Sequence, residues 1–236
     1  MSNCPKPCHS PCYSLSPCPI DAQMSVIRKS GFTMVELMIA SAISTMVSIT
    51  MLSFYMVNYK IGFVSQERNE INADIRTLTS QLIRDGREAN YFVLYDSIQA
   101  EDRNHPADRQ LDGQAGDFLV FVQHQESTSV GAPTLITNIV AYYRSLETSE
   151  ANELAPVRRL ELVINPGSAA PLEDLLPDQV SLIMGREVIE LSRGLANGRL
   201  FYNFWGRSIM VNGQIHHGNE AKRVTETYNF TVSPRG

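Results

Sequence analysis

Cysteine is scarce in this chain of 236 residues, and its four cysteines all lie near the amino terminus, at Cys4, Cys8, Cys12 and Cys18. Residues 32–236 therefore contain no thiols from which a disulfide could form. Because prolines and polar residues without apolar periodicity surround the cysteines, residues 1–23 predict no folded core. Two interpretations stay open: a cytoplasmic tail that binds a metal or a lipid, or upstream sequence before a true start at Met24. We favour the second.

Charge of either sign is missing from a long stretch near the amino terminus. Residues 37–59 contain no Asp, Glu, Lys or Arg. A helix of about 20 apolar residues, rising roughly 1.5 Å per residue, crosses the hydrocarbon core of a bilayer. We therefore predict a membrane-spanning helix over residues 32–59. Glu36 lies at its start, where an unpaired charge would cost on the order of 3 kcal/mol, so we expect a partner that the neighbouring sequence does not offer.

Proline is absent from residues 32–104, so this segment contains no residue that would break a helix. We predict one helix over residues 32–85, with Gly86 as its C-cap. Its second half carries an apolar stripe that we expect to pack on a sheet while the charged residues face water. A coiled coil with a partner is the alternative use of the same stripe. The stripe consists of Val64, Ile71, Ile75, Leu78 and Leu82.

The pattern changes after residue 87 to short apolar runs with a period of two, rich in β-branched and aromatic residues. Such runs are typical of strands, so we predict an α+β fold in which the long helix packs on a mainly antiparallel sheet. Asn212-Gly213 indicates a hairpin turn, because both residues tolerate positive φ. The predicted strands cover residues 91–95, 118–122, 136–143, 157–164, 180–184, 200–205, 208–215 and 224–232.

A basic pair and a glycine come directly before the apolar stretch, whereas a secretory signal peptide has its small residues after the apolar core. Cleavage between Gly31 and Phe32 would free an α-amine close to Glu36. The amine of one copy could then pair with the carboxylate of a neighbouring copy, which would favour self-association. Arg28 and Lys29 would keep the amino end in the cytoplasm by the positive-inside tendency.

The hexapeptide Gly-Phe-Thr-Met-Val-Glu at residues 31–36 resembles the cleavage and methylation motif of type IV prepilins and type II secretion pseudopilins. This resemblance implies that a prepilin peptidase cuts after Gly31, that Phe32 is N-methylated, and that Glu36 docks subunits into a filament. The implied partners are the prepilin peptidase and methyltransferase, other pilin or pseudopilin subunits, an inner-membrane assembly platform and membrane lipid. A plain single-pass anchor with an incidental Glu36 is the alternative.

The carboxyl-terminal part is similar in its order of segments to minor pilins and to J-type pseudopilins of type II secretion. The similarity covers residues 139–144, 157–160, 175–180 and an aromatic strand that ends at Trp205. It implies a structural subunit held in the inner membrane with a periplasmic head, and later part of a periplasmic or surface filament. The alternatives are a J-type pseudopilin and a membrane-anchored periplasmic binding domain that never polymerises.

The predicted organisation has four parts: a leader over residues 1–31, a membrane and filament-core helix over 32–59, its amphipathic continuation over 60–86, and a β-rich head over 87–236. An excess of acidic over basic side chains, 25 against 20, argues against general nucleic-acid binding.

Catalytic motifs are not found: residues 32–236 contain no Ser, His and Asp constellation and no phosphate-binding loop, so we predict neither an enzyme nor a cofactor. We predict no metal site either. His216 and His217 are adjacent, which places them on opposite faces of a strand, and no carboxylate or thiol lies nearby at ligand spacing. His124 is interpreted as a solvated loop residue. The acidic segment 101–117 is also interpreted as a solvated loop, since basic residues interleave there.

Overall fold

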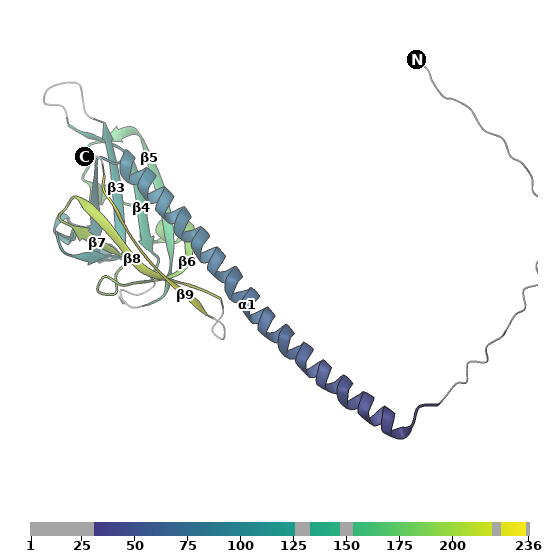
Figure 1. Cartoon of the computed structure of the whole chain (residues 1–236). Helices are drawn as coiled ribbons and strands as arrows, with labels where there is room; N and C mark the ends of the chain where they lie inside the picture. The colour runs from purple at the N-terminus through teal and green to yellow at the C-terminus, as the bar shows by residue number, and fades with distance from the viewer. Residues whose placement is uncertain (1–30, 126–132, 147–152, 219–222, 235–236) are drawn as a thin grey trace, which may run out of the picture. The chain divides into compact units, whose positions relative to one another are not determined.

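The computed structural model describes residues 31–125, 133–146, 153–218 and 223–234. By its internal contacts the chain divides into two units, Met1–Ser53 and Phe54–Gly236. Helix α1 (Met34–Glu88) contributes to both, and the β-rich head belongs to the second (Figure 1). The predicted α+β class, with one long helix and an antiparallel sheet, is confirmed. The cysteine segment and the leader residues Arg28 and Lys29 lie outside the described residues.

Helix α1 extends three residues beyond the predicted end, so Gly86 lies inside the helix and is not its C-cap. A Cβ atom at Gly86 would lie 2.7 Å from Cγ1 of Val232, near the carboxyl end of the chain, so the glycine allows a close approach. The predicted apolar stripe is confirmed, because Ile71, Leu78 and Leu82 are fully buried within the chain's own core.

The sheet has nine strands, and every strand pair in the described part of the chain is antiparallel. Its order is β1-β3-β4-β5-β6-β8-β7-β2, and β9 pairs with β8. The strands are β1 (Tyr91–Tyr95), β2 (Ala115–Gly116), β3 (Phe118–Gln125), β4 (Leu135–Arg144), β5 (Ala155–Ser168), β6 (Arg186–Gly194), β7 (Phe201–Phe204), β8 (Ser208–His217) and β9 (Val224–Val232).

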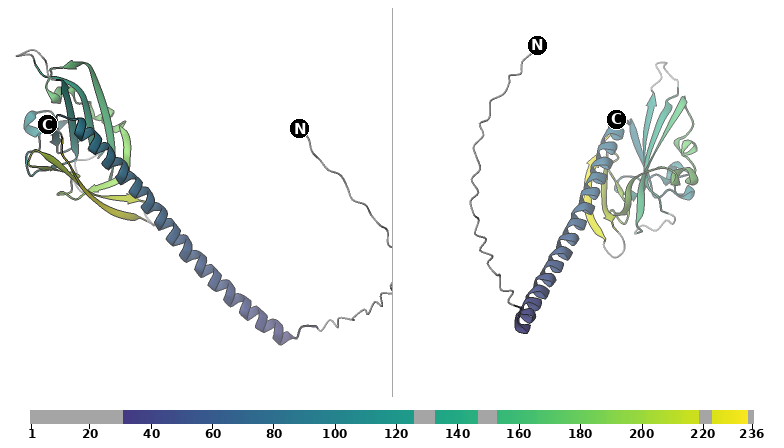
Figure 2. Two further views of the ribbon diagram at one scale, coloured as in Figure 1. Left: turned by 45° about the horizontal axis from the view of Figure 1, so that its top comes forward. Right: turned by 90° about the vertical axis from the view of Figure 1, so that its right-hand side faces the viewer.

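Both faces of the sheet are covered, since alternate residues of a strand point to opposite sides. Leu119 and Phe121 of β3 belong to the core beneath the carboxyl-terminal half of α1. Figure 2 shows this half of the helix along one face of the sheet. Phe118 belongs to a second core on the other face, which Leu172 of α2 (Leu172–Leu175) and Leu182 of α3 (Gln179–Ile183) complete. Two 3-10 turns, η1 (Ala100–Asp102) and η2 (Pro106–Asp108), follow β1.

The strand predicted over residues 180–184 is wrong, because this run forms the short helix α3. Its sequence carries a helix start signal: the Asp178 side chain accepts a hydrogen bond from the Ser181 backbone over 3.3 Å, as an N-cap does. Strand β6 was not predicted, because its apolar residues Val188, Ile189 and Leu191 are interrupted by Glu190 and flanked by polar residues.

The predicted hairpin turn at Asn212-Gly213 is also wrong, because both residues lie inside β8. Gly213 is needed there for space: a Cβ atom would lie 2.8 Å from the Tyr228 hydroxyl oxygen. The chain turns between β7 and β8 at Trp205 and Gly206, whose φ angles are 58° and 61°. The predicted strands over residues 200–205 and 208–215 left a break at this place, but tryptophan seldom adopts positive φ, so the sequence did not indicate the conformation of the turn.

Candidate functional site

The motif residues Gly31, Phe32 and Glu36 lie at the start of α1, and Thr33 caps the helix. The Thr33 hydroxyl accepts a hydrogen bond from the Glu36 backbone N–H, and the Glu36 carboxylate accepts from the hydroxyl and the backbone N–H of Thr33, each over 3.3 Å. This reciprocal arrangement is a capping box. Glu36 therefore has a neutral partner in its own chain, and no ion pair joins its carboxylate to another described residue.

Gly31 is not required by packing in the described part of the chain, where a Cβ atom at this position would meet no heavy atom within 4 Å. The head contains glycines of the opposite kind, such as Gly194, whose Cβ atom would collide with neighbouring backbone. The space around Gly31 is thus compatible with a requirement set by a separate molecule that acts on this bond.

The amino-terminal part of α1 presents apolar side chains on all sides. Phe32 is 79% exposed and Met34 is 84% exposed, and the most apolar window of the helix has no buried residue. By length and composition, α1 can cross a membrane. An apolar surface of this extent is unfavourable in water, so lipid or other protein must cover it.

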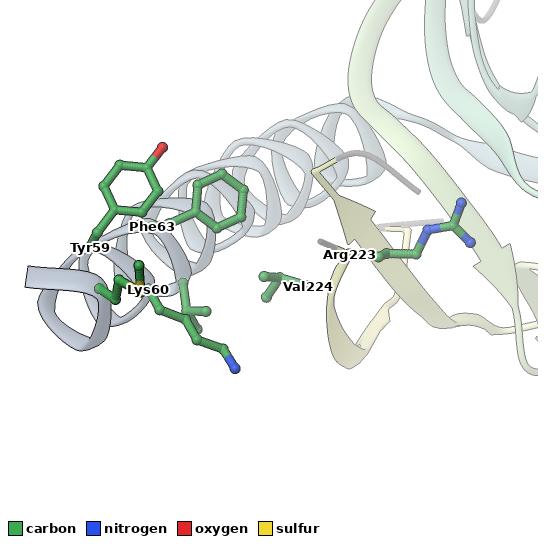
Figure 3. A pocket seen from close by; sticks show the side chains of 7 residues that line it. Tyr59, Lys60, Phe63, Arg223 and Val224 are labelled. Atoms are coloured by element: carbon green, nitrogen blue, oxygen red, sulfur yellow. The ribbon is translucent and has the colours of Figure 1, made fainter. Parts of the chain in front are cut away.

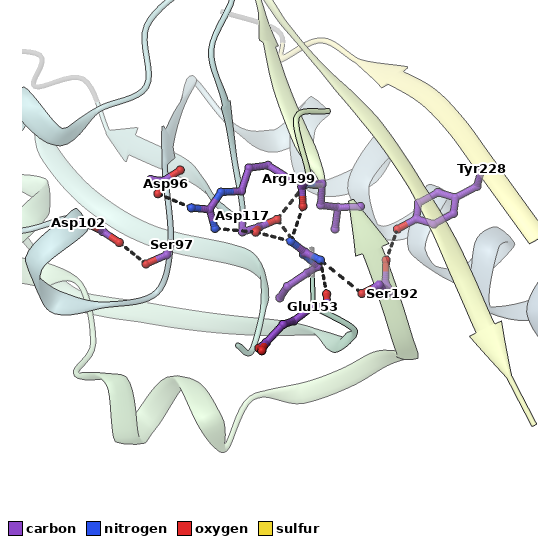
Figure 4. Close-up of polar contacts among 11 residues, drawn as sticks. Asp96, Ser97, Asp102, Asp117, Glu153, Ser192, Arg199 and Tyr228 are labelled. Atoms are coloured by element: carbon purple, nitrogen blue, oxygen red, sulfur yellow. Dashed lines mark hydrogen bonds and ion pairs between the residues drawn. The ribbon is translucent and has the colours of Figure 1, made fainter. Parts of the chain in front are cut away.

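In the head, Asp117 and Arg144 form an ion pair in which neither side chain is exposed. Arg144 Nε donates to Asp117 Oδ1 over 2.8 Å, and Nη2 donates to Oδ2, so the guanidinium fork meets the carboxylate with two bonds. Figure 4 labels Asp117, the carboxylate at the centre of these contacts. The same guanidinium donates to the backbone carbonyls of Glu153 and Gly198 over 2.9 Å and 2.8 Å. The charge of Arg144 is thereby neutralised by groups of the protein itself.

A second arginine extends this network. Arg199 Nη1 donates to Asp117 Oδ2 over 3.1 Å, and Nη2 donates to Asp96. The Leu200 backbone N–H donates to Asp117 Oδ1 over 2.8 Å. Burial raises the pKa of the Asp96 carboxyl, although Arg199 counteracts the shift. The charges of two guanidiniums and two carboxylates thus cancel. These four side chains join the segment before β7 to the end of β1, the start of β3 and the end of β4.

The interpretation of residues 101–117 as a solvated loop is wrong for Asp117. One signal could have identified it: Asp117 comes directly before an apolar strand and Arg144 ends the next one, and antiparallel pairing brings such residues together. His124 also differs from the interpretation, because it lies in β3 and not in a loop.

A separate polar cluster attaches α1 to the sheet. Tyr142 of β4 and Arg159 of β5 both donate to Oδ2 of the buried Asp85, the latter over 2.8 Å. Burial alone would raise the pKa of the Asp85 carboxyl, but the hydrogen bonds from Arg159 and Tyr142 lower it below its usual value. The last turns of the helix are therefore held by a charged contact as well as by apolar packing.

A shallow groove of about 440 Å³ lies between α1 and the start of β9 (Figure 3). Its charged lining residues are Lys60 and Arg223, and Figure 3 shows the Arg223 guanidinium pointing away from the groove. No Asp, Glu or His of the described residues lines it. The described lining consists of Met56, Tyr59, Lys60, Phe63, Val64, Arg223 and Val224.

The two adjacent histidines of β8 have different environments. His216 Nδ1 lies 3.0 Å from the Thr225 hydroxyl, and burial lowers the pKa of its imidazole. His217 is buried and its ring faces acidic side chains of α1, among them Asp74, whose Oδ2 lies 3.1 Å from Nε2. Sequence spacing could not reveal these carboxylates, because they lie more than a hundred positions before the histidines.

Comparison with known protein families supports the motif predicted at the start of the chain. A family model of the prokaryotic N-terminal methylation motif matches residues 27–52. No curated protein and no solved structure matches the chain. The matched region contains Gly31, Phe32, the capping box and the exposed apolar start of α1. Residues 27–52 therefore carry the prokaryotic N-terminal methylation motif, which supports the predicted similarity of this chain to type IV pilins and pseudopilins.

Proposed function

We propose that this chain is a non-catalytic minor pilin or pseudopilin subunit, cleaved after Gly31 and assembled through α1 into a type IV pilus-like filament. The methylation motif at residues 27–52, which includes the uncovered apolar start of α1, is the observation that carries this proposal. The unprocessed chain spans the inner membrane with Arg28 and Lys29 in the cytoplasm and its head in the periplasm. Filament neighbours then replace lipid around the apolar surface.

Cleavage creates a positive charge that can pair with the Glu36 carboxylate, which has no cationic partner among the described residues of the single chain. Hydrolysis of the peptide bond between Gly31 and Phe32 frees the Phe32 α-amine, which accepts one methyl group and keeps its positive charge. Thr33 offers Glu36 only neutral hydrogen bonds. An ammonium on a neighbouring copy neutralises the carboxylate in apolar surroundings and fixes the axial position of one subunit against the next.

The groove beside Lys60 and Arg223 favours a second candidate, a membrane-anchored periplasmic binding domain that never polymerises. This candidate requires that the protein keep its activity when Glu36 is replaced. A J-type pseudopilin of type II secretion is the alternative within the same superfamily.

We expect Gly31→Leu to abolish processing, because the side chain must enter the peptidase beside the scissile bond, while the head folds normally. Intact-mass measurement on membranes from cells with a prepilin peptidase should give the parent chain as a product that begins at Phe32 and is heavier by one methyl group. The variant should accumulate as the precursor. Gly62→Ala is the control, since a Cβ atom at Gly62 would also meet no described heavy atom within 4 Å. Processing of Gly31→Leu at the parent rate would contradict the proposal.

We expect Glu36→Gln to be processed normally but to enter filaments about 100-fold less well, since an unpaired charge in an apolar setting costs about 3 kcal/mol. Immunoblotting of sheared filaments against membrane-retained protein measures the ratio. Glu101→Gln, which changes an exposed carboxylate of the head, serves as the matched control. Equal incorporation of Glu36→Gln and the control would favour the non-polymerising candidate.

A further inference from the structure

His217, at the end of β8, lies among four carboxylates of the head unit. Glu67, Glu70 and Asp74 lie on one face of α1, at spacings of three and four residues, and Glu190 comes from β6. The His217 side chain is only 7% exposed. We call these five residues the His217 cluster.

The two nitrogens of the His217 ring have different surroundings. Nε2 lies 3.1 Å from Asp74 Oδ2, a hydrogen-bond distance. Nδ1 lies 3.7 Å from Glu190, 3.8 Å from Glu67 and 3.9 Å from Glu70, each measured to Oε2. These three distances exceed those of hydrogen bonds, so Nδ1 has no hydrogen-bond partner among the described residues.

The electrostatics of the His217 cluster favour a cation at Nδ1. When Nε2–H donates to Asp74, the Nδ1 lone pair faces three carboxylate oxygens, which is repulsive unless positive charge lies between them. None of the three oxygens lies at the roughly 2.8 Å of a charge-assisted hydrogen bond, so Nδ1 stays open to a cation.

We propose that the His217 cluster binds one divalent transition-metal ion of the zinc class, with His217 Nδ1 and carboxylate oxygens of Glu67 and Glu70 as ligands. These three donor atoms lie within 4.8 Å of one another, and tetrahedral zinc, with bonds of about 2.0–2.2 Å, needs donors about 3.4 Å apart. Glu70 and Glu190 are 53% and 60% exposed, so their side chains can move inward. Glu190 lies outside this group of three donors, and an inward movement of its side chain would make it the fourth ligand.

The ring orientation and the ligand types support this assignment. A histidine that binds a metal usually donates its other N–H to a carboxylate, which fixes the tautomer, and Asp74 lies where this role requires. Calcium and magnesium prefer oxygen ligands alone, whereas imidazole with carboxylates suits zinc and its transition-metal neighbours. The bound ion joins α1 to β6 and β8. This inference does not depend on assembly into filaments.

The test uses the full chain in detergent micelles, treated with iodoacetamide so that the four amino-terminal cysteines cannot bind zinc. After chelator treatment, the protein is dialysed against buffered free zinc, and bound metal is counted by mass spectrometry. We expect about one zinc per chain, a higher unfolding temperature with zinc than without, and no displacement by excess calcium.

Substitutions locate the ion. We expect Glu67→Gln/Glu70→Gln to weaken zinc binding more than tenfold, and Asp74→Asn to weaken it about 10–100-fold through the ring orientation. Glu101→Gln is the matched control, and circular dichroism checks that each variant keeps its fold. Substoichiometric zinc in the parent chain, or equal affinity in the double variant and the control, would overturn the proposal. Cobalt in place of zinc gives an independent readout, since its visible absorption should disappear in folded Glu67→Gln/Glu70→Gln.

Discussion

Asp117→Ala is expected to lower the free energy of unfolding of the head by about 3–5 kcal/mol, the range for removing one partner of a buried ion pair. The loss arises because Arg144 has no exposed surface and would keep its charge without a carboxylate. Arg199 and the Leu200 N–H would also lose an acceptor. Unfolding of the full chain in micelles by guanidinium chloride, monitored by the circular dichroism of the sheet, measures the change in free energy.

Two comparisons make this expectation specific to the buried charge. Glu187→Gln removes a half-exposed carboxylate that lies 3.3 Å from Arg158, and a surface pair of this kind contributes at most about 1 kcal/mol. Asp117→Ala/Arg144→Met should lose less stability than the sum of the two single variants, because it leaves no unpaired guanidinium at position 144. A loss from Asp117→Ala no larger than that from Glu187→Gln would show that water or another group neutralises Arg144.

Gly194→Ala is expected to destabilise the head by about 3 kcal/mol, at the upper end of the usual cost of overpacking. Its Cβ atom would lie 2.0 Å from the carbonyl carbon of Arg199 and 2.5 Å from the Leu200 nitrogen. Backbone atoms cannot move aside as a flexible side chain can. The collision would also shift Leu200 N–H away from Asp117, so packing and the charged network would fail together.

The matched control is the same substitution at a glycine without close neighbours. Gly62 lies in the interior of α1, where no described atom lies within 4 Å of a Cβ position, and alanine should stabilise such a helix by about 0.5–1 kcal/mol. The two substitutions therefore have opposite expected signs under the same denaturation assay. Similar stability of Gly194→Ala and the parent chain would mean that β6 can move away from Arg199 at little cost.

The parts of the fold that depend on residues close together in the sequence could be predicted from the sequence. The helix and its stripe follow from spacing along the chain, and the runs at residues 91–95 and 224–232 match β1 and β9 at both ends. The pair Asn212-Gly213 led to a wrong prediction because it is typical of a hairpin turn. In the structure, Gly213 is required for a different reason, since a side chain there would collide with Tyr228 of β9. Competition from such distant neighbours is invisible in a local pattern.

The candidate sites divide in the same way. Gly31, Phe32 and Glu36 lie within six positions, so one motif could reveal them. Asp117 and Arg199 belong together only after the sheet forms, and Glu67 meets His217 only after α1 packs on it. In both cases the sequence alone suggested ordinary solvated charges, because burial is a property of the folded chain.

The close approach of Val232 to Gly86 joins the last turn of α1 to β9, the last strand of the sheet in chain order. Chain ends usually fray, since few contacts hold them. Here neither the last turn of α1 nor the end of β9 can separate without exposing the other. The two segments should therefore open as one cooperative unit, and their amide hydrogens should exchange with solvent at a common rate although they lie at opposite ends of the head sequence.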